Sequence, residues 1–358
     1  MLRKTIVKGI ALILVLIVGT MFIATGCATQ ETAPKSETPQ TPKAEVKEPS
    51  PQKQEKIILR YSEVNADNDP ETQAAYDFAK RVKEKSNGRI EVQIFPNGQL
   101  GGMKDIIQSL QMGAVDMARN NPSWLADAGI KKLNVLSLPY IFNDIGHANK
   151  VIEGPVGKQL LDEIKNANMQ LVGLGYYEPT LRHFFFTNKR VTKLSDLKGL
   201  KLRVPTSEMY KDMVEAFGAS PTPIAYGELY SALQTGVVDG AENPLKGYYN
   251  MKFYEVAKKF TFDAHQYETS IILFSEMVWN KLSEDDKKLI TEAFNESAQY
   301  YKEMSQKLYD EYLTDLEKQG VEFSEVENTQ EWQDAVKHLY DKYGVGMEDI
   351  IDQIKNTK

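Results

Sequence analysis

The sequence predicts an α/β fold of two lobes, with one long helix that spans both. Three observations predict it. Beyond residue 57, strand patterns alternate with helix patterns, which is the order of parallel α/β lobes. The segment Leu110–Asn120 recurs at Leu233–Asn243, and a helical pattern runs from Ser283 to Gly320. A chain of 358 residues also exceeds a usual single core and is long enough for two lobes.

Composition narrows the classes of function. The chain is 42% hydrophobic and 26% charged, with a net charge of −7, and this balance argues against a nucleic-acid-binding protein. Anionic ligands stay possible, because a local pair of arginines outweighs a distant acidic surface. The single cysteine excludes a disulfide within the chain and a thiolate metal cluster.

The N-terminus has the layout of a secretory signal over residues 1–26. Three basic residues lie within Met1 to Lys8, and Gly9 to Ala24 is apolar and uncharged. A short membrane-anchor helix is the alternative, since the apolar run is close to the spanning limit of about 17 residues. The segment Ala24-Thr25-Gly26-Cys27 resembles a bacterial lipoprotein cleavage box, which implies cleavage before Cys27 and a lipid on its sulfur.

A disordered tether is expected at residues 27–56. Beyond Cys27 the segment is rich in Thr, Pro, Glu, Lys and Gln and contains almost no large apolar side chains. Such a segment cannot bury enough surface to offset its conformational entropy. The folded body should therefore begin near Ile57.

The first lobe opens with two strand–helix pairs. Their residue patterns predict, in order, a strand at Ile57–Glu63, a helix at Asp69–Ser86, a strand at Arg89–Phe95 and a helix at Met103–Met112.

The repeated segment indicates two related lobes. Leu, Gln, Gly, Val, Asp, Ala and Asn recur at the same offsets in both copies. Each copy predicts a helix that ends at Gly113 or Gly236, followed by a short buried strand that ends at Asn120 or Asn243. The alternative is that Leu-Gln-x-Gly is only a common helix ending, which seven matches at fixed offsets argue against.

The C-terminal part begins with the long helix. Ser283 is a suitable N-cap, and at 1.5 Å per residue a helix from there to Gly320 would exceed roughly 50 Å, longer than one lobe. A strand at Val321–Val326 and helices at Gln330–Tyr343 and Met347–Lys355 are expected to follow. We expect one lobe to comprise residues 57–180 plus 269–308, and the other 181–268 plus 309–358.

Ligands of open α/β sheets bind just beyond the carboxyl ends of the strands, and Arg203 lies at such an end. Leu200 to Val204 alternates like a strand, and Pro205 stops its ladder. Thr206 and Ser207 then cap a helix, whose free backbone N–H groups favour an anion. A guanidinium can hold a carboxylate with two parallel hydrogen bonds. The alternative is a solvated edge arginine.

Other polar residues stand at equivalent strand ends, and each has a structural alternative. Arg119 and Arg182 could form internal ion pairs, Tyr226 could be core packing, and Glu63 could be a surface carboxylate. The complete set of expected binding residues is Arg203, Arg182, Asn243, Arg119, Tyr226, Glu63 and Asn65.

Several motifs resemble the substrate-binding proteins of tripartite ATP-independent periplasmic (TRAP) transporters. They are Lys198–Pro205, Leu233–Pro244, Phe95–Gly101 and Leu138–Phe142, in the family's order along roughly residues 57–345. The resemblance implies a two-lobed, periplasmic-binding-protein-like fold with a hinge and a lobe-spanning helix. It also implies extracytoplasmic delivery of an organic acid to TRAP permease subunits, with no cofactor.

The same resemblance implies roles for particular residues. The arginine matching Arg203 clamps the substrate carboxylate, the position matching Arg182 supports it, and that matching Asn243 hydrogen-bonds the same ligand. Arg119, in Met117-Ala118-Arg119, resembles the subgroup that handles sugar acids. C4-dicarboxylates and hydroxy acids also offer a carboxylate and stay open as ligand classes. We expect the two lobes to close on the acid as a clamp.

Rival functions have less support. An enzyme is not expected, because the four histidines are scattered and neither H-E-x-x-H nor G-x-S-x-G occurs. A hydrolase that uses paired carboxylates stays open. A ligand-sensing receptor domain of the same fold, or the binding protein of another transporter class, would share the clamp and differ in its partner.

Overall fold

The computed structural model describes residues 55–358, which belong to one compact unit. The expected signal peptide, the lipidation site at Cys27 and nearly all of the expected tether lie outside the described residues. Within the described part, no helix is both long and apolar enough to cross a membrane.

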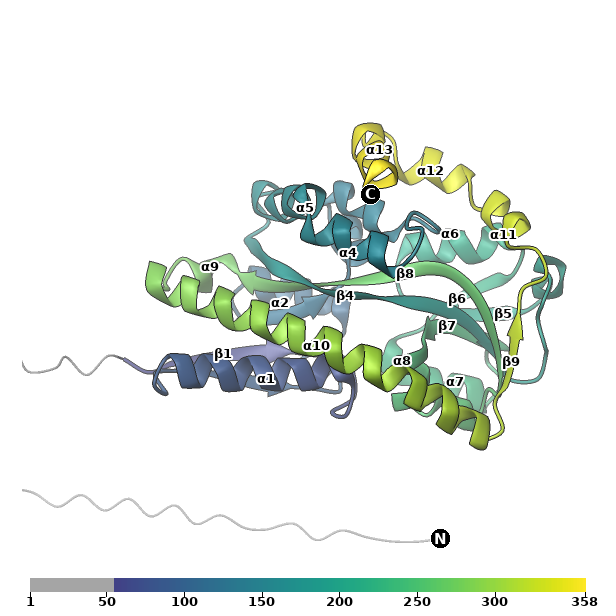
Figure 1. Cartoon of the computed structure of the whole chain (residues 1–358), viewed down its shortest axis with the longest axis horizontal. Helices are drawn as coiled ribbons and strands as arrows, with labels where there is room; N and C mark the ends of the chain where they lie inside the picture. The colour runs from purple at the N-terminus through teal and green to yellow at the C-terminus, as the bar shows by residue number, and fades with distance from the viewer. Residues whose placement is uncertain (1–54) are drawn as a thin grey trace, which may run out of the picture. The chain divides into compact units, whose positions relative to one another are not determined.

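A single mixed sheet runs through the body (Figure 1). Its strands follow the order β2-β1-β3-β8-β4-β7-β5-β6, with β9 paired to β8. The strands are β1 Ile57–Ser62, β2 Ile90–Phe95, β3 Met117–Asn120, β4 Leu171–Phe186, β5 Lys201–Val204, β6 Ser220–Pro223, β7 Gly240–Pro244, β8 Lys259–Ser275 and β9 Glu322–Glu325.

The two halves of this sheet have the same topology. In one half β1 lies parallel between β2 and β3, and β3 pairs antiparallel with β8. In the other half β5 lies parallel between β6 and β7, and β7 pairs antiparallel with β4. We call the β1–β3 half with α1–α5 the first lobe, and the β5–β7 half with α6–α8 the second. The two copies of the repeat take equivalent places in the two lobes.

The glycine of each repeat ends a helix. Helix α2 (Met103–Gln111) is followed by Gly113 at φ +68°, and α7 (Leu229–Gln234) by Gly236 at φ +70°. A left-handed residue turns the chain from the helix into the next strand, and glycine adopts that conformation without steric cost. The prediction that each helix ends at this glycine is therefore confirmed, although the C-cap residue itself is the one before it, Met112 or Thr235.

The aspartate of each repeat accepts a hydrogen bond from the backbone of a neighbouring strand. Asp116 Oδ2 accepts a hydrogen bond from the backbone N–H of Arg60 at 2.7 Å. Asp239 Oδ2 accepts one from the backbone N–H of Lys201 at 2.8 Å. Asp116 satisfies a backbone donor of β1 next to the start of the β1–β3 pairing, and Asp239 satisfies one of β5 next to the start of the β5–β7 pairing. This shared role explains why the aspartate recurs in both copies.

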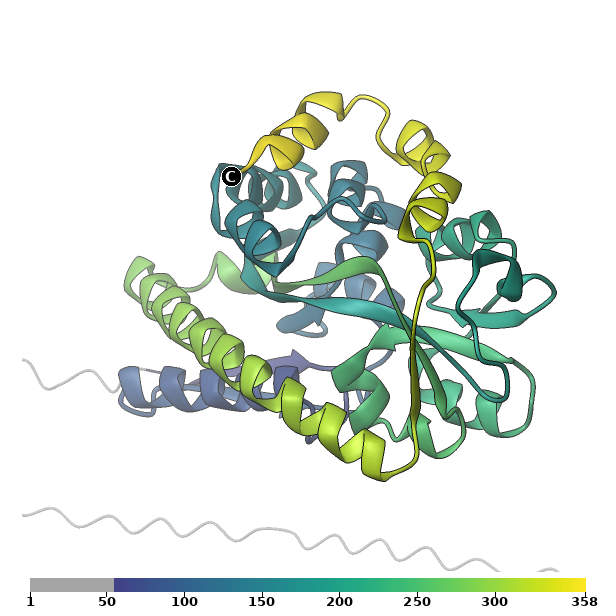
Figure 2. The same ribbon diagram turned by 45° about the vertical axis from the view of Figure 1, so that its right-hand side comes forward.

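The long strands β4 and β8 pass through both lobes side by side (Figures 1 and 2). Their pairing is irregular in the middle, with register shifts between Tyr177 and Thr180 and between Arg182 and Phe184. Thr180 lies opposite Glu268 in this stretch, where the lobe boundary is expected. The division into lobes that move against each other stays a prediction.

Helices cover both faces of the sheet. The remaining α-helices are α1 Pro70–Lys85, α3 Pro122–Asp127, α4 Ile145–Glu153, α5 Pro155–Asn166, α6 Glu208–Ala216, α8 Leu245–Asn250, α9 Glu276–Trp279, α10 Glu284–Lys318, α11 Thr329–Ala335, α12 His338–Tyr343 and α13 Glu348–Asn356. Short 3₁₀ helices lie at Lys131–Ser137, Leu194–Leu197, Tyr226–Glu228 and Phe253–Glu255.

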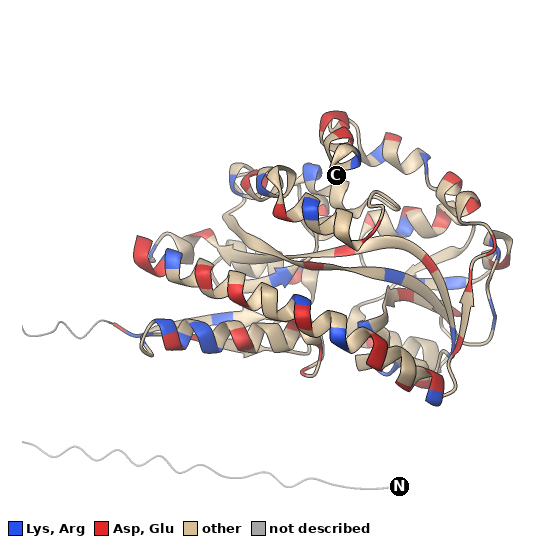
Figure 3. Cartoon of the chain, viewed as in Figure 1, with Lys and Arg blue, Asp and Glu red and all other residues tan. Residues whose placement is uncertain are grey.

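Helix α10 spans both lobes, as predicted. It has 35 residues, and the Ser283 hydroxyl accepts a hydrogen bond from the backbone N–H of Asp286 at its start. Phe294 packs in the first-lobe core with α1, whereas Leu316 packs in the second-lobe core with α8. Acidic and basic residues are interspersed along α10 and α1 (Figure 3).

The last helix differs from the expected lobe assignment. Trp332 of α11 lies in the second-lobe core, but Ile350, Ile351 and Ile354 of α13 pack in the first-lobe core with α4 and α5. The His147 Nε2 atom also lies 2.8 Å from the carbonyl oxygen of Ile354. Assigning all of residues 309–358 to the second lobe is therefore wrong at its end. The amphipathic pattern identified the helix but not the surface that its apolar face covers.

Gly175 provides a test of how α10 is seated on β4. A Cβ at this position would lie 2.2 Å from a ring carbon of Phe294. We expect Gly175→Ala to lower the free energy of unfolding by about 1–3 kcal/mol, the usual cost of overpacking a core. Chemical denaturation measures it. Gly227→Ala is the control, because no atom lies within 4 Å of its added Cβ. Equal midpoints for both variants would contradict the seating.

Candidate functional site

A cavity of about 520 Å³ lies between the two lobes, beyond the carboxyl ends of β1, β3, β5 and β7. This volume is in the usual range for small-molecule sites. Six of the seven expected binding residues line it, namely Asn65, Arg119, Arg182, Arg203, Tyr226 and Asn243. The strand-end rule therefore located the cavity from sequence.

Arg203 lines the cavity without a carboxylate partner. Its side chain is buried, with only 3% of the residue exposed, and its Nε donates to the carbonyl oxygen of Ile224 at 2.9 Å. Its guanidinium carbon lies 5.7 Å from the centre of the Tyr226 ring. Within residues 55–358 it forms no ion pair. The alternative of a solvated edge arginine is excluded.

Burial lowers the pKa of Arg203 to about 10, and the charge of Arg182 adds to this effect while Glu242 opposes it. A buried cation that lacks a paired anion has lost hydration without full compensation. An anion that enters the cavity would supply that compensation. Arg203 is thus arranged to receive a negative charge.

Arg182 differs, because carboxylates of the protein already occupy its guanidinium. Its Nη2 donates to Glu242 Oε1 at 2.9 Å, its Nε also pairs with Glu242, and its Nη1 donates to Glu268 Oε1 at 2.7 Å. Burial lowers its pKa, but the charge of Glu242 more than offsets this and holds the pKa well above the usual value. The internal ion pair, left open from sequence, is therefore present.

Arg119 is paired in the same way. It contacts Glu63 Oε1 at 2.8 Å and Glu71 Oε2 at 3.5 Å. Glu63 itself is fully buried and does not line the cavity. The expectation that Glu63 contacts the ligand is therefore wrong, and so is the alternative of a surface carboxylate. Glu63 follows the end of β1, and its side chain points toward Arg119 rather than into the cavity.

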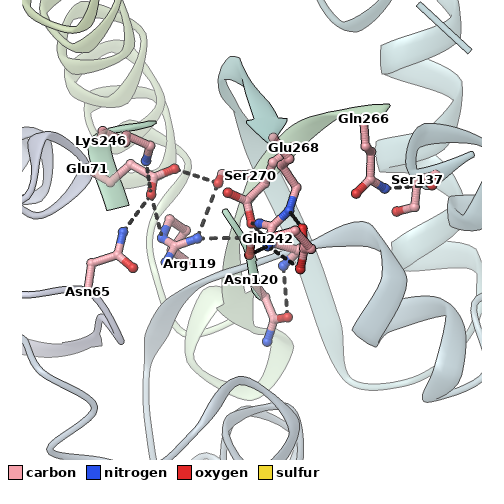
Figure 4. Close-up of polar contacts among 12 residues, drawn as sticks. Asn65, Glu71, Arg119, Asn120, Ser137, Glu242, Lys246, Gln266, Glu268 and Ser270 are labelled. Carbon is pink, nitrogen blue, oxygen red and sulfur yellow. Dashed lines mark hydrogen bonds and ion pairs between the residues drawn. The ribbon is translucent and has the colours of Figure 1, made fainter. Parts of the chain in front are cut away.

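Lys246, Asp69 and Glu268 also line the cavity, and sequence reasoning missed them. Lys246 Nζ lies 2.6 Å from Glu71 Oε2 (Figure 4). It also lies 3.8 Å from Asp69 Oδ1. These contacts join α8 of the second lobe to α1 of the first. The position of Asp69 and Lys246 in the sequence could have identified them, because each lies at the start of a helix that follows a strand end.

The two carboxylates beside Lys246 have opposite pKa shifts. Burial raises the pKa of Asp69 to about 6, although Lys246 opposes it. Burial also acts on Glu71, but Arg119 and Lys246 outweigh it and hold the pKa at about 2. Glu71 lies between the two cations (Figure 4), which explains the difference. It is therefore the carboxylate that holds this cluster together.

Asn243 and Tyr226 form one wall of the cavity beside Gly247. A Cβ at Gly247 would lie 2.3 Å from Asn243 Oδ1 and 2.9 Å from the Tyr226 hydroxyl oxygen. Glycine therefore keeps space for both polar groups. The Tyr226 ring also packs edge-on against Phe253, with ring centres 5.9 Å apart. Tyr226 thus serves both as cavity wall and as packing, the two roles weighed from sequence.

The start of helix α6 does not contribute as expected. The backbone N–H of Glu208 donates to Asp127 Oδ2 of the first lobe at 3.3 Å, and Glu208 does not line the cavity. Thr206 does line it, and its hydroxyl accepts from Trp124 Nε1 at 3.4 Å. The helix N-terminus therefore binds a carboxylate of the protein itself. These contacts also join the lobes over the cavity.

Known proteins share this sequence and architecture. The family model described as "Bacterial extracellular solute-binding protein, family 7" matches residues 61–345. The chain belongs to this family. The family acts outside the cytoplasm, and its members bind substrates for transporters.

Two solved structures and one curated protein illustrate the likeness to family 7. A TRAP periplasmic solute-binding protein of Bradyrhizobium sp. BTAi1, in complex with galacturonate, is 34% identical, with a TM-score of 0.80 over 84% of this chain and all of that one. One of Sulfurospirillum deleyianum with bound succinate is 31% identical, with a TM-score of 0.79 over 85% of this chain and all of that one. The C4-dicarboxylate-binding protein DctB of Bacillus subtilis is 31% identical over 81% of this chain and 83% of its own.

In this family 7 protein a buried histidine lies behind the cavity. His265 Nδ1 is 2.7 Å from Asp263 Oδ2, and its Nε2 is 3.3 Å from Glu242 Oε2. Burial lowers its pKa, but Asp263 and Glu242 outweigh burial and raise the pKa to about 9. No group of three or more His, Cys, Asp or Glu residues in the described part of the chain could hold a metal ion.

The raised pKa of His265 predicts a pH-dependent stability. A group whose pKa rises from 6.5 to about 9 on folding stabilises the fold fully below pH 6.5 and loses this contribution as the pH passes 9. We expect the free energy of unfolding to fall by about 1–3 kcal/mol across that window. Denaturant titrations without ligand measure it.

The control separates His265 from other titrating groups. His265→Gln should flatten the fall between pH 6.5 and 9, whereas His338→Gln, at an exposed position on α12, should leave it unchanged. Equal pH profiles for wild type and His265→Gln would contradict the assignment.

Proposed function

We propose that this chain captures a small organic acid of the sugar-acid or C4-dicarboxylate type outside the cytoplasm and delivers it to a TRAP permease. The observation that carries the proposal is the buried guanidinium of Arg203, which lines the cavity without an internal carboxylate among the described residues. The galacturonate and succinate complexes of related family 7 proteins support an acid as the ligand. The role is binding and release, without chemical change of the acid.

Arg203 would hold the ligand carboxylate with its two terminal nitrogens, because Ile224 already accepts from its Nε. Asn243 would hydrogen-bond the same ligand, and Tyr226 would form a wall beside it. Arg182 would hold Glu268 in place, and Arg119 would hold Glu63 in place. Neither arginine would be the sole partner of the acid, because each already has a carboxylate of the protein. Asn65 lies on the first-lobe side, where its Nδ2 donates to Glu71 Oε2 at 2.7 Å.

Closure of the lobes would couple binding to delivery. In an open cleft Arg203 is hydrated, whereas in the closed cavity it needs an anion to offset its desolvation. The Lys246–Glu71 ion pair and the Trp124–Thr206 hydrogen bond join the lobes in the closed arrangement. The irregular middle of β4 and β8 would serve as the hinge. The permease would then recognise the surface that closure creates.

Replacement of Arg203 tests the proposed clamp. We expect Arg203→Ala and Arg203→Lys to weaken acid binding roughly 100-fold or more, since loss of one partner of a buried charge pair costs about 3–5 kcal/mol. Lysine keeps a charge but lacks the planar pair of donors. Titration calorimetry with galacturonate and with succinate measures the effect.

Lys104→Ala is the control, because this lysine is an exposed residue on the rim of the same cavity. It should change affinity only a few-fold, since exposed charges are well screened. Near wild-type affinity in both Arg203 variants would reject this site. Chemical turnover of the bound acid by purified protein would reject the binding-only role.

We also propose that Cys27 carries a lipid that anchors the protein outside the cytoplasm. The support is the sequence Ala24-Thr25-Gly26-Cys27 after an apolar run, with a polar segment behind it. A lipid on a polar tether would let the folded body reach a permease in the same membrane.

Cys27→Ser tests the anchor. We expect the wild-type protein to incorporate labelled fatty acid and to fractionate with membranes, and Cys27→Ser to lose the label. Ser36→Ala, in the polar segment, is a control that should keep both properties. An unlabelled wild-type protein, or a labelled Cys27→Ser variant, would contradict the lipid anchor.

A further inference from the structure

We propose that the cavity selects acids that carry one carboxylate on a hydroxyl-rich body, and that it disfavours dicarboxylates. This inference rests on the proposed function and narrows its ligand class to sugar acids. It follows from how the charges around the cavity are already paired.

The residues around the cavity contain four buried cations, four buried carboxylates and the partly buried carboxylate of Glu268. In the described part of the chain the cations are Arg119, Arg182, Arg203 and Lys246. The carboxylates in contact with them, or in their immediate field, are Glu63, Asp69, Glu71, Glu242 and Glu268. The charged pair of His265 and Asp263 lies behind Glu242 and is itself balanced. The protein therefore has no surplus of positive charge for two ligand carboxylates.

Three of the four cations have partners within the protein. Arg119 is paired with Glu63 at 2.8 Å, and Arg182 with Glu268 at 2.7 Å as well as with Glu242. Lys246 is paired with Glu71 at 2.6 Å. Only Arg203, within residues 55–358, faces the cavity as a buried cation without an ion pair. One ligand carboxylate satisfies it.

A second ligand carboxylate would find no such partner. The charged groups that line the rest of the buried cavity include Glu268 and Asp69, whose carboxylates would repel it. To bind, it would have to displace the partly buried Glu268 from Arg182 or the buried Glu71 from Lys246, and each displacement leaves a carboxylate without its cation in a poorly hydrated site. Repulsion of this kind is how a site rejects an otherwise similar ligand.

The same carboxylates suit hydroxyl groups. Glu268 uses Oε1 to accept from Arg182 and Asn121, and Asp69 uses Oδ1 to accept from Asn65 and the backbone N–H of Glu71. Their second oxygens have no hydrogen-bond partner among the described side chains and backbone groups. A sugar hydroxyl can donate to each of them.

An ammonium group suits these oxygens less well. Arg182 lies within ion-pair distance of Glu268, and Lys246 lies 3.8 Å from Asp69. A ligand cation beside either carboxylate would therefore meet a protein cation as well. A neutral donor avoids this repulsion, which favours a hydroxyl-rich acid over a zwitterionic amino acid.

Titration calorimetry on the purified protein tests the selectivity with D-galacturonate, D-glucuronate, succinate, D-galactose and L-serine. We expect at least one of the two sugar acids to bind about 100-fold more tightly than succinate, because succinate leaves the hydroxyl acceptors unpaired and brings a second charge. Galactose lacks the carboxylate for Arg203 and should bind more weakly still. Serine binding as tight as the better sugar acid would contradict the proposal.

Glu268→Gln tests the cause of the selectivity. Removal of this charge releases Arg182 Nη1 from its carboxylate partner. Succinate should therefore bind this variant at least tenfold more tightly than it binds wild type, and the difference in affinity between the sugar acid and succinate should become smaller. Asp162→Asn, an exposed carboxylate on α5, is the matched control and should leave both affinities unchanged. Thermal unfolding of each variant confirms that it is folded. An unchanged difference in affinity between the sugar acid and succinate in folded Glu268→Gln would overturn the role given to Glu268.

The outcomes separate this inference from the proposed function. Succinate binding as tightly as the sugar acids, and lost in Arg203→Ala, would overturn the selectivity and leave the acid clamp intact. Acid binding that survives in Arg203→Ala, or no binding of any acid, would overturn both.

Discussion

A guanidinium without a carboxylate is the constraint on which the structure of this site depends. Arg203 is buried, yet the nearby Glu242 is engaged by Arg182 and His265. The carbonyl of Ile224 and the ring of Tyr226 compensate only part of its lost hydration. The protein therefore carries one buried charge that no ion pair within residues 55–358 compensates, and the proposed acid would supply the missing charge.

The symmetric sheet brings the other groups to that charge. The halves β1–β3 and β5–β7 direct their carboxyl ends at one cavity, because each half joins one of the two long central strands. Arg119 and Asn243 reach the cavity from β3 and β7, which are the equivalent strands of the repeat. The repeat thus contributes to the site as well as to the fold.

Much of the fold and of the candidate site was predictable from sequence, and the features that were not predicted share a physical cause. The positions of Arg203, Arg182, Asn243 and Asn65 around one cavity follow from local patterns, because strand ends and caps are local features. The direction of a side chain is not local. Glu63 turns to Arg119, and α13 packs on the first lobe, because of neighbours far along the chain.

The contributions of Asp69, Lys246 and Glu268 were missed for the same reason. Glu268 lies in the irregular middle of β8, where no local pattern marks an exit from the sheet. The partners of Lys246, Asp69 and Glu71, belong to the opposite lobe and lie about 175 residues earlier in the chain, so only the folded structure brings them together. Strand ends predicted the site, but the pairing of its charges needed the structure.

The long helix α10 has a mechanical consequence. Its first half is seated on β4 where Phe294 fills the space left by Gly175, while its second half packs through Tyr312 against Tyr249 of the other lobe, with ring centres 4.3 Å apart. Because α10 is a rigid helix held at its first half, a rotation of the first lobe would become a sliding movement at its second half. The proposed opening of the clamp would therefore shear the stacked rings of Tyr249 and Tyr312, the contact that joins the second half of α10 to the second lobe.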